Sequence, residues 1–151
     1  MPATTEQIYI RWMIRRDMPV VEAIEKECFD FPWESDDFIR RLRQRNVIGM
    51  VAERDGNIEG YMIYELYPNR LHLLNFAVAK RAQWQGVGRA MTVKLAGKMS
   101  VDRRNRITVD VRETNIEAQL FFKAMGFRAI RVLRGFYFDS GEDAYLFQRR
   151  M

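Results

Sequence analysis

Cysteine and histidine each occur only once in the sequence, as Cys28 and His72. A single cysteine excludes a disulfide within the chain, and one cysteine with one histidine supplies too few ligands for a zinc site. Cys28 follows Val21 and Ile24 at helical spacing, which favours a small buried hydrophobe over a nucleophile. We therefore expect neither a metal centre nor disulfide chemistry.

Long apolar runs are also missing. No stretch approaches the roughly 20 apolar residues that a membrane-spanning helix needs. Arg11, Arg15 and Arg16 interrupt the first apolar stretch, so it does not resemble the core of a signal peptide. This pattern predicts a cytoplasmic protein that does not engage a membrane.

Acidic residues are outnumbered, with 20 Asp and Glu against 25 Lys and Arg, for a net charge of +5. Basic clusters at residues 40–45 and 103–106 raise the question of nucleic-acid binding. Both clusters lie beside acidic residues, and no finger, recognition helix or aromatic-rich strand accompanies them. We therefore do not expect nucleic acid as the partner, whereas an acidic cofactor or acidic partner stays open. The sequence leaves the oligomeric state unknown.

Apolar residues are plentiful at 48%, enough for the core of a single domain over residues 1–151. Strand patterning occurs at residues 8–13, 47–53, 58–67, 71–78, 107–111, 127–133 and 144–148. Helical spacing follows Asp17 and Ser35 and returns at residues 86–99 and 115–124. This order predicts an α/β (α+β) fold with a mixed central sheet of about six to seven strands and helices on both faces.

Local signals predict where several of these elements begin and end. Asp17 and Ser35 are suitable N-caps for the first two helices. Arg54-Asp55-Gly56-Asn57 predicts a hairpin turn, and Gly126 suits a left-handed turn after the last helix.

The segment Gln83-Trp84-Gln85-Gly86-Val87-Gly88 links a predicted strand to a predicted helix. Glycine lets the main chain approach a ligand closely, and the free N–H groups at a helix start bind phosphate. The endings of a nucleotide triphosphatase loop and the third Rossmann glycine are absent. A pyrophosphate would suit this loop, although packing or capping alone can also explain two glycines.

The residues from 73 to 90 resemble the acetyl-CoA motif of the GNAT superfamily, and residues 115–127 resemble its second motif. The resemblance extends to Phe31-Pro32-Trp33, residues 111–115 and residues 142–144, in an order like that of the ribosomal-protein alanine N-acetyltransferase branch. It covers nearly the whole chain. It implies a GNAT-like domain that uses acetyl-CoA and releases coenzyme A.

The resemblance assigns the cofactor to backbone groups of the strand, to the loop amides and to two residues of the second motif. These positions are Phe76, Ala77, Val78, Gln83, Trp84, Gln85, Gly86, Val87, Gly88, Arg89, Asn115 and Phe122. Asn115 suits an N-cap equally well, and the two roles are compatible.

Acetyl transfer to an amine needs a neutral nucleophile and a proton for the departing thiolate. The resemblance places Asp110 at the general-base position, where this short carboxylate would act through water; pairing with Arg112 is the structural alternative. A histidine such as His72 has a reference pKa near 6.5, suited to proton transfer, although a lone strand histidine can be structural. We expect Asp110 to contribute more than His72.

Phe122 stands where family members commonly have a tyrosine acid. Tyr137, an ordered water or no dedicated acid would then protonate the thiolate. Phe31, Trp33 and Tyr137 match positions that line the acceptor groove, although aromatic residues also fit a core.

The acceptor is predicted from amine chemistry and from the resemblance together. An α-amino group has a pKa of about 7.7 to 8.0 against about 10.4 for lysine, so it needs less help near neutrality. We predict an N-acetyltransferase that acetylates the N-terminal α-amine of a protein by direct transfer, with water- or carboxylate-assisted deprotonation. A small-molecule amine acetyltransferase and a noncatalytic acyl-CoA-binding module are the alternatives.

Overall fold

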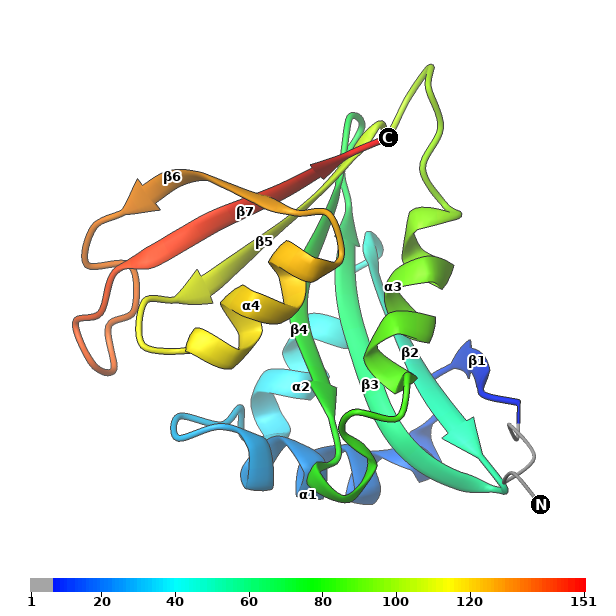
Figure 1. Cartoon of the computed structure of the whole chain (residues 1–151). Helices are drawn as coiled ribbons and strands as arrows, with labels where there is room; N and C mark the ends of the chain where they lie inside the picture. Colours follow the sequence, from blue (N-terminus) through cyan, green and yellow to red (C-terminus); the bar gives the residue numbers. More distant parts are fainter. Residues whose placement is uncertain (1–6) are drawn as a thin grey trace. The chain divides into compact units, whose positions relative to one another are not determined.

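A computed structural model describes residues 7–151 of the chain (Figure 1). Within this part, seven strands follow the hydrogen-bonded order β1-β2-β3-β4-β5-β7-β6. The strands are β1 (Tyr9–Trp12), β2 (Val47–Arg54), β3 (Asn57–Leu66), β4 (Leu71–Val78), β5 (Arg106–Arg112), β6 (Arg128–Leu133) and β7 (Ala144–Arg150). The helices are α1 (Met18–Cys28), α2 (Ser35–Leu42), α3 (Val87–Ala96) and α4 (Ile116–Ala124), with short 3-10 turns η1 (Arg15–Asp17) and η2 (Lys80–Ala82).

The sheet is mixed, because β4 pairs in parallel with β5 while β5 pairs antiparallel with β7. The predicted α/β class is therefore confirmed. The described residues divide into two compact units, one of residues 7–64 and 75–95 and one of residues 65–74 and 96–151. The single domain over residues 1–151 stays a prediction.

The first unit contains the β2–β3 hairpin and the antiparallel pair of β1 with β2, in which Tyr9 lies opposite Glu53. The hairpin turn is the predicted one. Asp55 and Gly56 have φ angles of 56° and 77°, and positive values at both central residues are what a type I′ turn requires.

Gly60 allows a close approach within the first unit. A Cβ at this position would lie 2.9 Å from the Ala77 carbonyl oxygen, 3.0 Å from Met91 Cε and 3.1 Å from Val87 Cγ1. Any side chain here would push away the strand or the helix start. Gly60 therefore sets where the first turn of α3 lies against β3 and β4.

Asp17 holds the predicted N-cap position of α1 but its side chain makes no cap hydrogen bond, and the cap predicted at Ser35 is wrong. The Asp17 carboxylate accepts hydrogen bonds from the Arg11 guanidinium at 2.8 and 2.9 Å and from the Ile14 N–H at 2.8 Å, instead of capping α1. At α2 the N-cap is Glu34, whose N–H donates to Asp37 Oδ2 at 2.8 Å. Ser35 is the first helical residue, and its hydroxyl donates to Glu22.

The second unit is built around β5, with β4 pairing through His72 opposite Thr108 and β7 pairing through Asp110 opposite Leu146. Strand β6 then pairs antiparallel with β7. Gly126 follows α4 with a φ of 91°, as predicted for a left-handed turn.

Over residues 7–151, no helix is both long and apolar enough to cross a membrane. In the same range, no three His, Cys, Asp or Glu side chains are grouped so that they could hold a metal ion.

Candidate active site

The Gly-rich turn lies between η2 and α3 in the first unit. Trp84 and Gly86 take the left-handed conformation, with φ angles of 67° and 86°. The Gln85 amide donates to the Arg81 carbonyl at 3.1 Å, and its oxygen accepts from the Arg54 guanidinium. The Gln85 side chain thus donates to Arg81 and accepts from Arg54, and these two bonds fix the shape of the turn.

Gly86 owes its place to its backbone conformation. A Cβ at this position would meet nothing within 4 Å, so close packing does not explain the residue. The first α3 hydrogen bond runs from the Ala90 N–H to the Gly86 carbonyl at 3.0 Å. The N–H groups at residues 87–89 therefore have no acceptor inside the helix, and they carry the positive end of its dipole. This turn fits a pyrophosphate.

Strand β4 presents two faces of different burial. His72, Leu74, Phe76 and Val78 are half-buried, whereas Leu71, Leu73, Asn75 and Ala77 are buried. This alternation places His72, Leu74, Phe76 and Val78 on one face of β4. The Val78 carbonyl accepts from the Gln83 amide and the Cys28 thiol, both at 3.2 Å.

Cys28 behaves as the sequence predicts. Its side chain is half-buried, and burial is the main reason that the pKa of its thiol rises to about 11. The thiol is therefore protonated near neutral pH and is a poor nucleophile.

His72 and Asp110 come together in the second unit. His72 Nε2 lies 3.1 Å from Asp110 Oδ2, and His72 Nδ1 lies 2.7 Å from the Thr108 hydroxyl. The His72 and Asp110 side chains are 14% and 18% exposed, so water can reach a pair that the protein largely encloses. With one ring nitrogen bonded to a carboxylate and the other to a hydroxyl, the imidazole is held in a fixed orientation.

Tyr137 belongs to the same unit, beneath the side chain of Arg112. The Arg112 guanidinium carbon lies 3.9 Å from the centre of the Tyr137 ring. Burial, with a further contribution from the nearby Asp110 charge, raises the pKa of Tyr137 to about 12. The phenol therefore keeps its proton at neutral pH.

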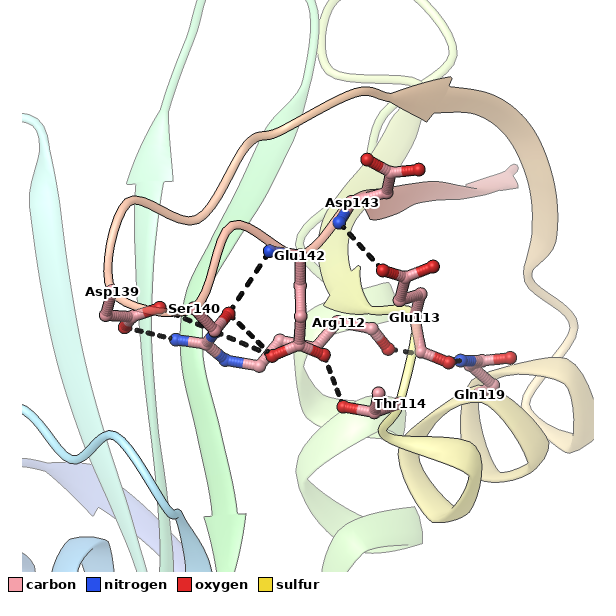
Figure 2. Close-up of polar contacts among 8 residues, drawn as sticks. All are labelled: Arg112, Glu113, Thr114, Gln119, Asp139, Ser140, Glu142 and Asp143. Atoms are coloured by element: carbon pink, nitrogen blue, oxygen red, sulfur yellow. Dashed lines mark hydrogen bonds and ion pairs between the residues drawn. The ribbon is translucent and has the colours of Figure 1, made fainter.

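Figure 2 shows a polar cluster that joins the end of β5, the start of α4 and the loop before β7. The Arg112 guanidinium donates to both Asp139 oxygens at 2.9 and 2.7 Å and to Glu142 Oε2 at 3.2 Å. Glu142 also accepts from the Thr114 hydroxyl. We call this group the Arg112 cluster: Arg112, Glu113, Thr114, Gln119, Asp139, Ser140, Glu142 and Asp143.

The two predicted cofactor residues of α4 have clear structural roles. The Asn115 side chain accepts from the Ala118 N–H at 3.1 Å, so the predicted N-cap is confirmed. Phe122 is 4% exposed, and its ring centre lies 5.1 Å from that of Phe127 in an edge-on contact. Contact of either residue with a cofactor stays a prediction.

Phe31 and Trp33 lie in the segment between α1 and α2 of the first unit. Phe31 is 44% exposed, and the Trp33 ring centre lies 5.2 Å from that of buried Phe38. The Trp33 N–H donates to Glu25 at 2.8 Å. Trp33 is thus anchored, while Phe31 offers an aromatic surface.

Sequence reasoning missed the partners of the acid and base. Thr108, Asp110 and Arg112 alternate along β5, so one polar face carries all three. That period of two was the available signal for Thr108. Arg112 was considered only as a partner for Asp110, whereas its guanidinium binds Asp139 and Glu142 across a long loop that local patterning does not place.

Comparison with known proteins places this geometry in a family. The sequence model of the acetyltransferase (GNAT) family matches residues 18–127. An uncharacterized N-acetyltransferase of Methanocaldococcus jannaschii is 30% identical over 138 residues, covering 91% of this chain and 88% of that one. The ribosomal protein bS18-alanine N-acetyltransferase of Escherichia coli is 26% identical over 132 residues, covering 86% and 88%.

A solved structure shows the same fold. The crystal structure of Arabidopsis thaliana NAA60 in complex with acetyl-CoA has a TM-score of 0.81 and 20% identity, covering 96% of this chain and 100% of that one. The family match spans more than half of the chain, and the relatives cover most of it. The chain therefore belongs to the GNAT family of acetyltransferases.

Proposed function

We propose that this acetyltransferase uses acetyl-CoA to acetylate the N-terminal α-amine of a protein. The observation that carries the proposal is the His72–Asp110 pair, a proton acceptor in which His72 lies on the half-buried face of β4. Support for the acceptor comes from the Escherichia coli relative, whose name gives an alanine of ribosomal protein bS18. A ribosomal acceptor would place the enzyme in the cytoplasm, as the sequence predicts.

The turn between η2 and α3 is the proposed cradle for the cofactor. The N–H groups at residues 84–89 would hold the pyrophosphate, and backbone groups of Phe76, Ala77 and Val78 would hold the pantetheine. Gly86 suits the cradle because its left-handed backbone turns the chain without a side chain in the way. When bound, acetyl-CoA supplies an acetyl thioester, whose thiolate is a far better leaving group than an amide nitrogen.

His72 and Asp110 would remove the proton from the acceptor amine. The Asp110 carboxylate accepts a hydrogen bond from His72 Nε2 at 3.1 Å, which stabilises the imidazolium if the ring takes up a proton. Either group can act directly or through one water. An α-amine with a pKa of about 7.7 to 8.0 makes modest demands on such a base.

Tyr137 would return a proton to the departing thiolate. Phe122 has none to give, and its ring lies in the buried contact with Phe127. Tyr137 stays protonated because burial raises its pKa to about 12. Arg112 above the ring and the Arg112 cluster hold the loop that carries this phenol. Phe31 and Trp33, with Tyr137, are the proposed contacts to the acceptor peptide.

The decisive experiment combines the protein with acetyl-CoA, a library of N-terminal peptides and a set of polyamines. Mass spectrometry then locates the acetyl group. We expect acetylation on the peptide α-amine and no reaction with matched peptides whose α-amine is blocked. Acetyl groups only on polyamines or lysine side chains would refute the acceptor. Cofactor binding in calorimetry without any transfer would indicate a noncatalytic acyl-CoA-binding module.

A further inference from the structure

The first unit contains a buried carboxylate that belongs neither to the His72–Asp110 pair nor to the Arg112 cluster. Glu25 on α1 is only 2% exposed. Its Oε1 accepts from the Tyr61 hydroxyl and from Asn75 Nδ2 at 2.7 Å, and its Oε2 accepts from the Trp33 N–H at 2.8 Å. One side chain thus joins α1, the segment of residues 29–34, β3 and β4.

The chemistry of these contacts suits an ionised carboxylate. Three donors face the two oxygens of Glu25. An ionised carboxylate only accepts hydrogen bonds, whereas a protonated carboxyl group also carries an O–H donor. Tyr61 remains a donor, because burial and the Glu25 charge raise the pKa of its phenol. None of these three donors is a cation, so the buried charge depends on hydrogen bonds alone. Burying a charge in this way is costly unless every bond is kept.

The two oxygens of Glu25 have separate tasks. Oε1 binds the sheet through Tyr61 and Asn75, whereas Oε2 holds the backbone of the segment between α1 and α2. A second connection runs through rings, since Trp33 packs on Phe38 at 5.2 Å and Phe38 packs on Tyr61 at 6.2 Å. The segment with Phe31 and Trp33 is therefore tied to β3 by a polar contact and an aromatic contact.

We propose that Glu25 is a positioning residue for the acceptor, which holds residues 29–34 in the conformation that receives the peptide. This inference rests on the proposed function, in which Phe31 and Trp33 contact the acceptor. Asn75 directly precedes the strand residues proposed to hold the pantetheine. Glu25 thereby sets the place of the acceptor segment relative to the cofactor strand.

Glu25→Gln separates the two tasks, because an amide has only one acceptor oxygen. If this oxygen stays with Tyr61 and Asn75, the amide nitrogen faces the Trp33 N–H, and two donors oppose each other. We expect the KM for the acceptor peptide to rise about tenfold or more, the range for loss of a hydrogen bond to a charged group. The kcat and the affinity for acetyl-CoA should change little.

The matched control is Glu27→Gln on the same helix. Glu27 is exposed and accepts only a long bond from the Lys80 N–H at 3.3 Å among the contacts described. This variant should keep the wild-type KM. Hydrogen exchange at the Trp33 amide gives a reading without turnover: the amide should be protected in wild type and in Glu27→Gln, and should exchange faster in Glu25→Gln.

A general supporting role predicts a different pattern. Equal losses in acetyl-CoA affinity, kcat and acceptor KM in Glu25→Gln would overturn the proposal, as would an unchanged KM. If Glu25→Gln does not fold, Tyr61→Phe removes one sheet contact and keeps the bond to Trp33, so the acceptor KM and the Trp33 protection should persist. Loss of both would also overturn the proposal. Protection at Trp33 with no peptide acetylation by wild type would instead count against the proposed function.

Discussion

The Gly-rich turn of the first unit is defined by its backbone, whereas the His72–Asp110 pair of the second unit is defined by its side chains. The turn is backbone, shaped by positive φ angles at Trp84 and Gly86. The pair is made of side chains on two strands, brought together by the register of β4 with β5. Backbone conformation can be read from local sequence, whereas a register depends on residues far apart. The difference also predicts how each feature fails when it is altered.

The largest effects should come from the side-chain pair. Asp110→Asn and His72→Phe should each lower kcat by about two to four orders of magnitude, the usual range for a general base. Affinity for acetyl-CoA should be preserved, because the proposed cradle is formed by backbone groups and not by these two side chains. Steady-state rates and calorimetry on folded variants provide the measurement, with Asp110→Asn expected to be the slower enzyme.

A double variant tests whether the pair acts as one unit. Since His72 Nε2 and Asp110 Oδ2 share a contact of 3.1 Å, the two losses should not add. Asp110→Asn with His72→Phe should be about as slow as the worse single variant. Fully additive losses would mean that the two residues act independently, and near-normal rates in both would leave deprotonation to water.

The next largest effect should appear at the backbone turn. Gly86→Ala forces a Cβ into a left-handed conformation at a cost of about 1–2 kcal/mol, or roughly a 5- to 30-fold change in an equilibrium. Neither Gly86 nor Gly56 has atoms within 4 Å of the added Cβ, so Gly56→Ala is a matched control with the same kind of strain. Both should lower the melting temperature, but only Gly86→Ala should weaken acetyl-CoA binding in calorimetry. Equal affinities for acetyl-CoA in the two variants would refute the assignment of the cofactor to this turn.

The contrast between the two features also explains what the sequence could predict. The hairpin at Asp55 and Gly56 and the turn at Gly126 were predicted correctly because positive φ is a local requirement. Membership of the GNAT family was expected from the resemblance of residues 73–90 and 115–127 to the motifs of that family, and it is confirmed. Asp17 occupies the predicted N-cap position of α1, but its carboxylate binds Arg11 instead of the helix backbone, and the cap predicted at Ser35 was wrong because Glu34 is the N-cap and the Ser35 hydroxyl donates to Glu22.

Contacts between distant residues lay beyond that reasoning. His72 and Asp110 were separate candidates, and only the parallel register placed them at hydrogen-bond distance. The same holds for Arg112 with Asp139, 27 residues apart. Glu25 had no motif to mark it, since its role depends on donors from three other parts of the first unit. Which residues touch the cofactor and the acceptor remains a prediction.

A smaller effect should come from the Arg112 cluster, because its Arg112–Asp139 ion pair, with side chains 22% and 39% exposed, is more exposed than the His72–Asp110 pair. Arg112→Gln should raise the acceptor KM about twofold to fivefold, in line with other partly exposed ion pairs. The kcat should change less than in Asp110→Asn. A loss of activity as large as that of Asp110→Asn would give Arg112 a direct part in the reaction.

The same cluster should respond to acid. The hydrogen bond from Arg112 holds the pKa of Asp139 below its ordinary 3.8, and that from Thr114 holds the pKa of Glu142 below its ordinary 4.5. Carboxylates with lowered pKa stabilise the folded loop fully above these ordinary values and lose this effect as the pH falls through the lower ones. Amide NMR signals of residues 134–143 should therefore broaden or shift below about pH 4. Wild-type signals unchanged in that range would argue against the cluster as a clamp.

The smallest effect on turnover should come from Phe122→Tyr, which tests whether a phenol at position 122 improves proton donation to the thiolate. The change introduces the tyrosine that the family resemblance predicts as a proton donor at this position, so turnover should be kept or raised. Phe122 is only 4% exposed beside Phe127, and a hydroxyl buried there without a partner would cost about 1–3 kcal/mol. We therefore expect a lower melting temperature together with an unchanged or higher kcat.

Phe127→Tyr is a matched control, since Phe127 is 1% exposed in the same contact and is not a proposed acid. A strong fall in kcat for Phe122→Tyr alone, with folding intact, would show that the site requires an apolar residue at position 122. The proton for the thiolate would then come from Tyr137 or water.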